Sequence, residues 1–276
     1  MLPADNHIHS RWSWDTAETS TMELECARAI HRGIPAVAFT EHVDFAVWGD
    51  GDGTRWPSLQ LGDRPPSFAP LDIAGYQANI EKCREMFPDL RVLSGIEAGE
   101  PHLFPASVTR VLGAGSFDRV LGSLHCIPVD GRLEGDTWTL FTRHDPYDLM
   151  ERYFAELFAL VEESQLFEVL AHCDYPRRSW PTARVGGYRE ADFEDHYRSV
   201  FQALASSQRV LEINTGSPLA SAALMRWWWE EGGQAVSFGS DAHRPSLVGD
   251  QFELAVHIVE AAGFRPGRNR FDFWRR

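Results

Sequence analysis

The chain has 276 residues, which is enough for one large hydrophobic core or two small ones. Hydrophobic residues make up 43% and charged residues 24%, values close to the globular average, so a disordered or collagen-like chain is excluded. The formal net charge of −14 has the wrong sign for sequence-independent binding to a nucleic-acid backbone, although some of the acids could instead bind cations.

The sequence contains no segment that we expect to enter a membrane or to direct secretion. No run of about 18 apolar residues occurs, and residues 1–10 lack the basic and apolar regions of a signal peptide. Four cysteines, Cys26, Cys83, Cys126 and Cys173, are far apart and form no CxxC pair. A reducing, cytoplasmic location is therefore expected.

Seven short runs of apolar and β-branched residues predict strands, and longer amphipathic stretches separate them. In chain order, the runs cover residues 4–8, 34–40, 91–96, 119–124, 167–171, 209–213 and 234–239.

Helical patterns fill the intervals between these runs. Ser20 begins a capping-box pattern, and Gly33 is expected to end that helix. Apolar residues three and four apart in residues 73–87 form one stripe, and Asp145 before Pro146 is typical of a helix start. Further helices are expected at residues 189–206, 218–231 and 247–262.

The alternation of strands and helices favours a single parallel α/β domain over residues 1–276, either a barrel or an open sheet. Residues 44–70 and 128–144, in which Gly and Asp recur, do not fit this alternation. We expect both segments to be long loops over the face that carries the binding site, because loops of this length are often lids or binding loops.

Side chains that can bind metal lie at the end of every predicted strand. In a parallel barrel these carboxyl ends meet on one face, where active sites are built. Packing many imidazoles and carboxylates together there would be costly without a compensating cation. In chain order, the polar residues at these ends are His7, His9, His42, Glu97, His125, His172, Asp174, Glu212, Asn214, Asp241 and His243.

The kinds of side chain indicate which ions are bound. His7 and His9 are two residues apart, so alternation along a strand places both rings on one side. Imidazoles and carboxylates without thiolates suit zinc, manganese or iron rather than a structural, cysteine-rich zinc site. The donors exceed the needs of one tetrahedral ion, so two or three divalent ions are expected. Such clusters favour the hydrolysis of phosphate esters.

The motifs around these residues resemble those of the PHP (polymerase and histidinol phosphatase) family of metal-dependent phosphoesterases, in particular its stand-alone histidinol-phosphate phosphatases. The resemblance covers nearly the whole chain, in the family's order, and implies a single domain with a distorted, TIM-like (β/α)7 barrel and a trinuclear metal site. The matching motifs are DNHIH (5–9), TEH (40–42), GIE (95–97), GSLH (122–125), AHCD (171–174) and GSDAH (239–243).

The resemblance also implies which residues hold each ion. Glu97 would bridge two ions and support the metal-bound hydroxide that attacks phosphorus. Many relatives carry His at the place of Asp15. The carboxylate of Asp15 is a harder ligand than imidazole and favours manganese or iron. Grouped by ion, the nine ligands are His7, His9, Glu97 and Asp241; Glu97 again with His125 and His172; and Asp15, His42 and His243.

Six further residues are expected around the ions. Glu41 is expected to orient His42, and Asp174 to support a ligand without touching an ion. A basic residue after His172 is expected to bind the phosphate, and Arg178 is favoured for this role. The alternative is that these residues only form a charged turn in solvent. Glu212 and Asn214, at the end of a later predicted strand, would position substrate or hold ligands by hydrogen bonds. The residues expected to contact substrate are therefore Arg177, Arg178, Glu212 and Asn214.

The implied reaction is the hydrolysis of L-histidinol phosphate to L-histidinol and phosphate, a step of histidine biosynthesis. The residues alone support only a small phosphate monoester, so another substrate of the same family, such as a nucleotide or a sugar phosphate, is the alternative. A nuclease or polymerase accessory module is disfavoured by the net charge of −14. An inactive scaffold is disfavoured by the complete set of ligands.

Overall fold

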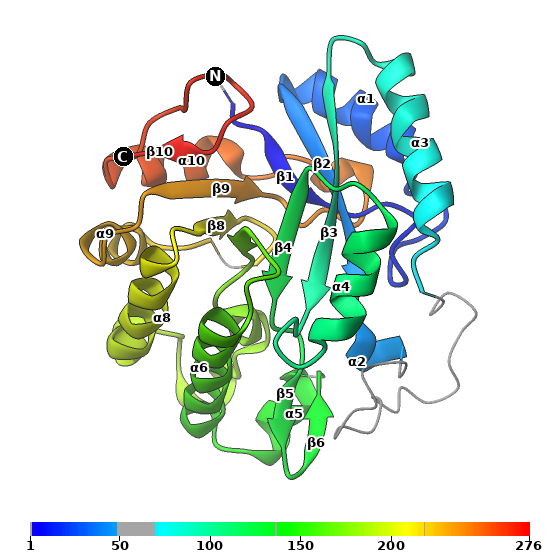
Figure 1. Ribbon diagram of the computed structural model, residues 1–276. Coiled ribbons are helices and arrows are strands. Elements are labelled where there is room, and N and C mark those ends of the chain that lie inside the picture. The colour runs from blue at the N-terminus through cyan, green and yellow to red at the C-terminus, as the bar shows by residue number, and fades with distance from the viewer. Residues whose placement is uncertain (1, 49–69, 136, 218) are drawn as a thin grey trace.

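In this computed structural model, the predicted strands join one curled sheet. The structure describes residues 2–48, 70–135, 137–217 and 219–276. In this part of the chain, seven parallel strands form the sheet, and a short antiparallel strand that the sequence did not predict is added at one edge (Figure 1). In sheet order, the strands are β1 (Asp5–Ile8), β2 (Ala36–Val43), β3 (Arg91–Gly99), β4 (Arg119–Ser123), β7 (Val169–Leu170), β8 (Val210–Asn214), β9 (Ala235–Gly239) and the antiparallel β10 (Trp274–Arg275).

The segment after β9 returns to β1 and brings the two sides of the parallel sheet together. The backbone N–H of His9 donates to the carbonyl of Ala242 at 2.8 Å, and that of Asp241 donates to the carbonyl of His7 at 2.8 Å. Ile8 also forms a parallel bridge with Ala242. The curled sheet confirms the predicted barrel-like fold with seven parallel strands.

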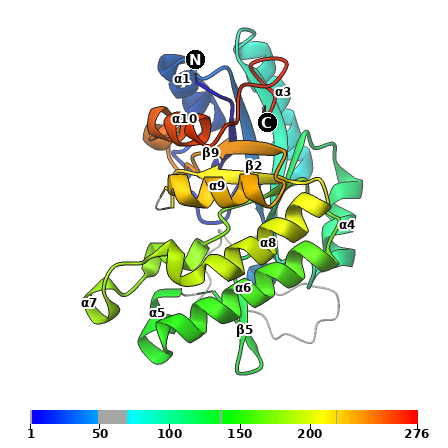
Figure 2. The same cartoon turned by 90° about the vertical axis from the view of Figure 1, so that its left-hand side faces the viewer.

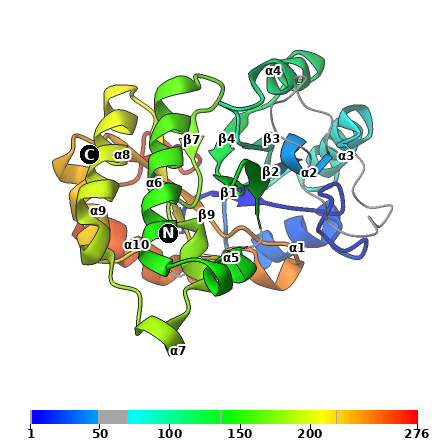
Figure 3. The ribbon, with the colours of Figure 1, turned by 90° about the horizontal axis from the view of Figure 1, so that it is seen from below.

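Helices cover the outside of the sheet in two groups. α1 and α3 pack together beside the first strands, whereas α6, α8 and α9 lie side by side along the later ones (Figure 2). Seen from below, the helices surround the strands, and α7 projects away from them (Figure 3). The longer helices are α1 (Met22–Arg32), α3 (Ile73–Met86), α4 (Pro105–Ala114), α6 (Pro146–Glu163), α8 (Glu194–Ser206), α9 (Ala222–Glu230) and α10 (Phe252–Ala261). The shorter ones are α2 (Phe45–Trp48), α5 (Thr137–Arg143), α7 (Thr182–Val185) and the 3₁₀ helices η2 (Tyr175–Ser179), η3 (Glu190–Phe193) and η4 (Pro245–Leu247).

The helix ends follow from local sequence, with one correction. The cap expected at Ser20 is wrong by one residue: the side chain of Thr21 caps α1, and the Ser20 hydroxyl donates instead to the buried carboxylate of Glu25 at 2.5 Å. Gly33 ends α1 in the left-handed region (φ 74°), as predicted. The side chain of Asp145 accepts hydrogen bonds from the first turn of α6, which confirms that helix start.

The two predicted long loops turn out differently. Residues 49–69, most of the first segment, lie outside the described residues, and α2 precedes them. The second prediction is wrong, because most of residues 128–144 belongs to a hairpin and α5. The hairpin pairs β5 (Ile127–Val129) with β6 (Arg132–Glu134), and Asp130 and Gly131 at its turn have φ of 50° and 78°.

The largest apolar core lies between α6, α8 and the later strands. Phe154 and Leu157 of α6 and Tyr197 and Phe201 of α8 are at most 1% exposed, and the rings of Phe154 and Tyr197 meet edge to face at 4.6 Å. Burial of each such side chain stabilises the fold by about 1.5–3 kcal/mol. This packing holds β7 and β8 in place. Among the described residues, no helix combines the length and apolarity needed to cross a membrane.

Candidate metal centre

The nine predicted ligands lie together at the carboxyl end of the parallel strands. His42 and Glu97 are paired neighbours on β2 and β3, because the register of a parallel sheet aligns its strand ends. The others belong to β1 or to the segments that follow β1, β4, β7 and β9. The residues that form this cluster are His7, His9, Asp15, His42, Glu97, His125, His172, Asp241 and His243.

Glu97 lies at the centre of the cluster and is completely buried. Its Oε1 is 2.7 Å from His172 Nε2 and 3.1 Å from His125 Nε2. Its Oε2 lies 3.1–3.4 Å from ring nitrogens of three further imidazoles, those of His7, His9 and His42. Five imidazoles therefore surround a single carboxylate.

The donor atoms around Glu97 fit divalent metal ions. Although Glu97 Oε2 is buried among nitrogens, it makes no hydrogen bond, and the same holds for Nδ1 of His42. A buried acceptor without a donor is costly unless a cation satisfies it. Four overlapping groups of three ligands have donor atoms within 4.8 Å of one another, namely His7, His9 and Glu97; His7, His172 and Asp241; His42, Glu97 and His125; and His9, His42 and His243.

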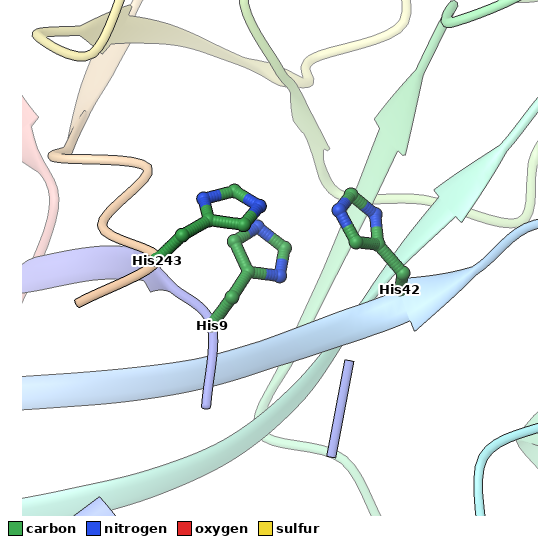
Figure 4. Close-up of side chains that lie close together, drawn as sticks. All are labelled: His9, His42 and His243. Carbon is green, nitrogen blue, oxygen red and sulfur yellow. The ribbon is translucent and has the colours of Figure 1, made fainter. Parts of the chain in front are cut away.

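The outer part of the cluster reaches solvent at Asp15 and His243, whose side chains are 30% and 31% exposed. The rings of His9 and His42 stack at 4.2 Å, and that of His243 lies 4.4 Å from His9 (Figure 4). Asp15 Oδ2 approaches Nε2 of His243 at 3.1 Å and Nε2 of His42 at 3.4 Å. The carboxylate of Asp15 thus lies beside His42 and His243, the two residues with which the resemblance grouped it.

The carboxylates and imidazoles of the cluster shift one another's pKa values. Burial opposes ionisation of Glu97, but the imidazoles of His7 and His125 outweigh it and hold the pKa of this carboxyl well below its usual range. Burial, with a contribution from His42, lowers the pKa of His9 and favours a neutral ring. Burial lowers the pKa of His7, His42 and His125, but the neighbouring carboxylates outweigh it and hold the pKa of each ring well above its usual range. Because metal binds neutral imidazole, these rings release protons when ions bind.

Glu212 supports the cluster instead of facing substrate. Its Oε1 is 2.7 Å from His7 Nδ1, and its Oε2 accepts hydrogen bonds from the backbone N–H of His172 (2.8 Å) and from Asn214 Nδ2 (3.1 Å). Asn214 Oδ1 in turn accepts from the backbone N–H of Ser217. Of the two roles considered for Glu212 and Asn214, the structure favours holding ligands and gives neither a place in the cavity.

Arg178, but not Arg177, reaches the cavity above the cluster. The cavity has a volume of about 200 Å³, and its lining includes Trp14, His42, His125, Tyr175, Arg178 and Asp241. Arg178 Nη2 donates to Ser217 Oγ at 2.7 Å and to Asp241 Oδ2 at 3.1 Å. The guanidinium is therefore fixed at the edge of the cluster.

Arg177 and Asp174 do not have the roles expected of them. Arg177 Nη1 donates to Asp174 Oδ2 (3.1 Å) and to Glu190 Oε1 (2.7 Å), and Asp174 Oδ2 also accepts from the hydroxyl of Tyr197. Neither residue lines the cavity or contacts one of the nine ligands through these bonds. Successive residues of the 3₁₀ helix η2 point about 120° apart, so Arg177 and Arg178 cannot face the same way.

Ser13 and Asp44 contact predicted ligands, although the sequence patterns did not predict either residue. Asp44 Oδ1 lies 3.2 Å from His125 Nδ1, and its Oδ2 lies 3.3 Å from His42 Nδ1. Asp44 follows His42 by two residues, the same spacing that placed His7 beside His9, so alternation could have indicated it. Ser13 contacts His9, and Glu41 binds Ser13 rather than the ring of His42; no sequence pattern marks Ser13.

Comparison with known proteins gives consistent matches over most of the chain. The family model of the PHP domain matches residues 5–216. The histidinol-phosphatase of Lactococcus lactis subsp. lactis (strain IL1403) is 24% identical over 280 residues, covering 96% of this chain and 93% of that protein. A probable histidinol-phosphatase of Deinococcus radiodurans is 28% identical over 272 residues, covering 95% and 94%.

Solved structures share the fold. The histidinol phosphate phosphatase of Lactococcus lactis, in complex with zinc, L-histidinol and phosphate, has a TM-score of 0.75 at 21% identity, with 96% of this chain and 95% of that chain covered. A putative histidinol phosphatase from Listeria monocytogenes has a TM-score of 0.74 at 15% identity, with coverages of 91% and 99%. These structures show the fold, and the donor atoms gathered around Glu97 indicate a site for divalent metal ions.

Proposed function

The chain belongs to the PHP domain family, and from that premise we propose that it is a metal-dependent phosphatase that hydrolyses L-histidinol phosphate to L-histidinol and phosphate. The observation that carries the proposal is the buried carboxylate of Glu97 among five imidazoles, three of which line a cavity that also presents Arg178. The choice of substrate draws on the relatives, which are named histidinol-phosphatases.

We propose two or three ions in this site, of zinc, manganese or iron. The contacts of Glu97 support a bridging role, because its two oxygens face different sets of nitrogens. The harder carboxylate of Asp15 in the outer set favours manganese or iron there. By ion, the assigned ligands are His7, His9, Glu97 and Asp241; Glu97, His125 and His172; and Asp15, His42 and His243.

Divalent ions, when bound, supply a nucleophilic oxygen from water at neutral pH and offset the charge of the phosphate. Arg178 has further N–H groups beyond its bonds to Ser217 and Asp241, and these donate to phosphate oxygens. Trp14 and Tyr175 form aromatic walls of the cavity, which exclude water and contact the carbon chain and imidazole of the substrate. The reaction consumes one water molecule and releases phosphate and an alcohol.

The remaining properties of the chain agree with a small metabolite in a reducing compartment. The net charge of −14 disfavours a nucleic-acid substrate. All four cysteines are buried thiols rather than disulfides, which suits the cytoplasm.

A phosphate-release panel tests the proposal. Metal-stripped protein reloaded with zinc, manganese or iron is assayed on L-histidinol phosphate, nucleoside monophosphates, sugar phosphates and single-stranded DNA. The expected result is much faster release from L-histidinol phosphate than from every other substrate; faster release from a nucleotide or a sugar phosphate would overturn the assigned substrate. Glu97→Gln should abolish release, whereas Glu25→Gln, an equally buried Glu outside the cluster, should retain it.

A further inference from the structure

A buried hydroxyl in the segment after β1 contacts one of the proposed metal ligands. Ser13 is 3% exposed, and its Oγ has three polar neighbours: Glu41 Oε2 at 2.6 Å, the backbone N of His42 at 3.0 Å and His9 Nδ1 at 3.1 Å. We propose that Ser13, oriented by Glu41, is a positioning residue that holds the proton of His9 on Nδ1 and thereby leaves Nε2 available to metal.

Counting donors and acceptors at Ser13 leads to this assignment. A hydroxyl has one proton and two lone pairs. The backbone N–H of His42 occupies one lone pair, because an amide can only donate. The shortest contact, at 2.6 Å to the Glu41 carboxylate, takes the hydroxyl proton. Only a lone pair remains for His9, so the ring must donate from Nδ1.

The surroundings of Glu41 keep it in the role of acceptor. The backbone N–H of Ser10 donates to both of its oxygens (3.2 and 3.1 Å), and the Ser10 hydroxyl donates to Oε1 at 2.6 Å. The Ser10 hydroxyl thus binds Oε1, and Oε2 accepts from the Ser13 hydroxyl as well as from the Ser10 N–H.

The tautomer of His9 matters because this ring takes part in both the inner and the outer groups of ligands. Its Nε2 lies 3.0 Å from His7 Nε2 and 3.4 Å from Glu97 Oε2 and Asp241 Oδ1. A lone pair aimed at this point completes a set of donors around one ion, whereas a proton there would exclude the ion. The inference rests on the proposed function only in requiring that the cluster binds metal ions.

Zinc titration of the metal-stripped protein, against a chelating dye, tests the proposal independently of activity. Ser13→Ala is expected to lower zinc affinity by about 10- to 100-fold, as is common when a group that orients a ligand is removed, and Ser13→Thr, which keeps the hydroxyl, to restore it. Ser20→Ala is the matched control, because Ser20 is also buried in this segment and also donates to a buried carboxylate, that of Glu25, but contacts no ligand. It should keep wild-type affinity.

Wild-type zinc affinity in Ser13→Ala would overturn the inference. An equal loss in Ser20→Ala would also overturn it, since it would indicate general loosening of the segment. If Ser13→Ala does not fold, Glu41→Gln takes its place with the same expected loss, because the amide offers one acceptor fewer. A wild-type protein that binds no zinc would overturn both this inference and the metal centre. A wild-type protein that binds zinc but does not hydrolyse L-histidinol phosphate would refute the proposed substrate alone.

Discussion

Replacing Glu212 with Gln should displace the proton of His7, because the amide keeps the shape of the side chain but has only one accepting end. One oxygen of Glu212 faces His7 Nδ1 at 2.7 Å, and the other accepts from the backbone N–H of His172 and from Asn214 Nδ2. The carboxylate is thus surrounded by three donors, and its side chain is 1% exposed.

The two orientations of the new amide differ in cost. If its oxygen faces His7, its NH2 group meets two donors, and two buried N–H groups are left without acceptors at about 1–3 kcal/mol each. If its oxygen faces His172 and Asn214, its NH2 group donates to His7 Nδ1, which only requires the ring proton to move to Nε2. The second orientation is favoured, and it places a proton on the nitrogen that faces Glu97 and Asp241.

The expected result for Glu212→Gln is a loss of zinc affinity of about 10- to 100-fold, equivalent to about 1.4–2.7 kcal/mol. It is measured by titrating metal-stripped protein with zinc against a chelating dye. Glu25→Gln serves as the control, because this Glu is equally buried but bonds to Ser20 rather than to a ligand. Unchanged zinc affinity in Glu212→Gln, or an equal loss in Glu25→Gln, would refute the reasoning.

Three further predictions test other parts of the molecule. Arg178→Ala should raise KM for L-histidinol phosphate by about 10- to 100-fold, because hydrogen bonds to a charged group are lost. Arg177→Ala should leave KM unchanged and lower the melting temperature. Equal KM values for the two variants in steady-state assays would contradict this. A Cβ at Gly239 would lie 2.0 Å from Oε1 of Glu212, so Gly239→Ala should reduce zinc affinity as Glu212→Gln does, and an unchanged titration would count against it. Burial raises the pKa of Glu25 well above its ordinary value of 4.5. Between pH 4.5 and the folded pKa, the folded state therefore keeps a proton that the unfolded state loses. The stability present below pH 4.5 is lost as pH rises toward the folded pKa. Relative to Glu25→Gln, urea unfolding of the wild type should show a free energy of unfolding that falls by about 1.4 kcal/mol per pH unit within that window; a constant difference would contradict the shift.

The cluster could be predicted from the sequence because its ligands follow strands. A parallel barrel brings the carboxyl ends of its strands to one face, so a residue such as Glu97 or His172 can be placed without knowing any side-chain contact. The spacing of His7 and His9 adds the alternation of a strand. Both arguments depend only on backbone geometry, which local sequence determines well here.

Side-chain direction within that face could not be predicted. The strand-end rule puts Glu212 at the correct end of the barrel but does not say that its carboxylate turns inward to His7. Arg177 and Arg178 are adjacent, and only the turn of η2 decides which one reaches the cavity. Ser13 lies in an irregular segment whose path depends on packing against Glu41, so no periodic pattern identifies it.

The error over residues 128–144 had a different origin. Asp130 and Gly131 form a pair typical of a tight hairpin turn, and the short strands IPV and RLE flank it. The composition of the segment suggested a loop because the same residues that make a tight turn are also common in loops.

The most direct test of the metal centre is the metal content of the protein after stripping and dialysis against zinc, measured by elemental analysis. Wild type should retain two or three ions per chain. Glu97→Gln should retain fewer, because one oxygen of Glu97 contacts two imidazoles and the other contacts three more. Wild-type protein with one ion or none per chain would contradict a shared, multinuclear site around Glu97.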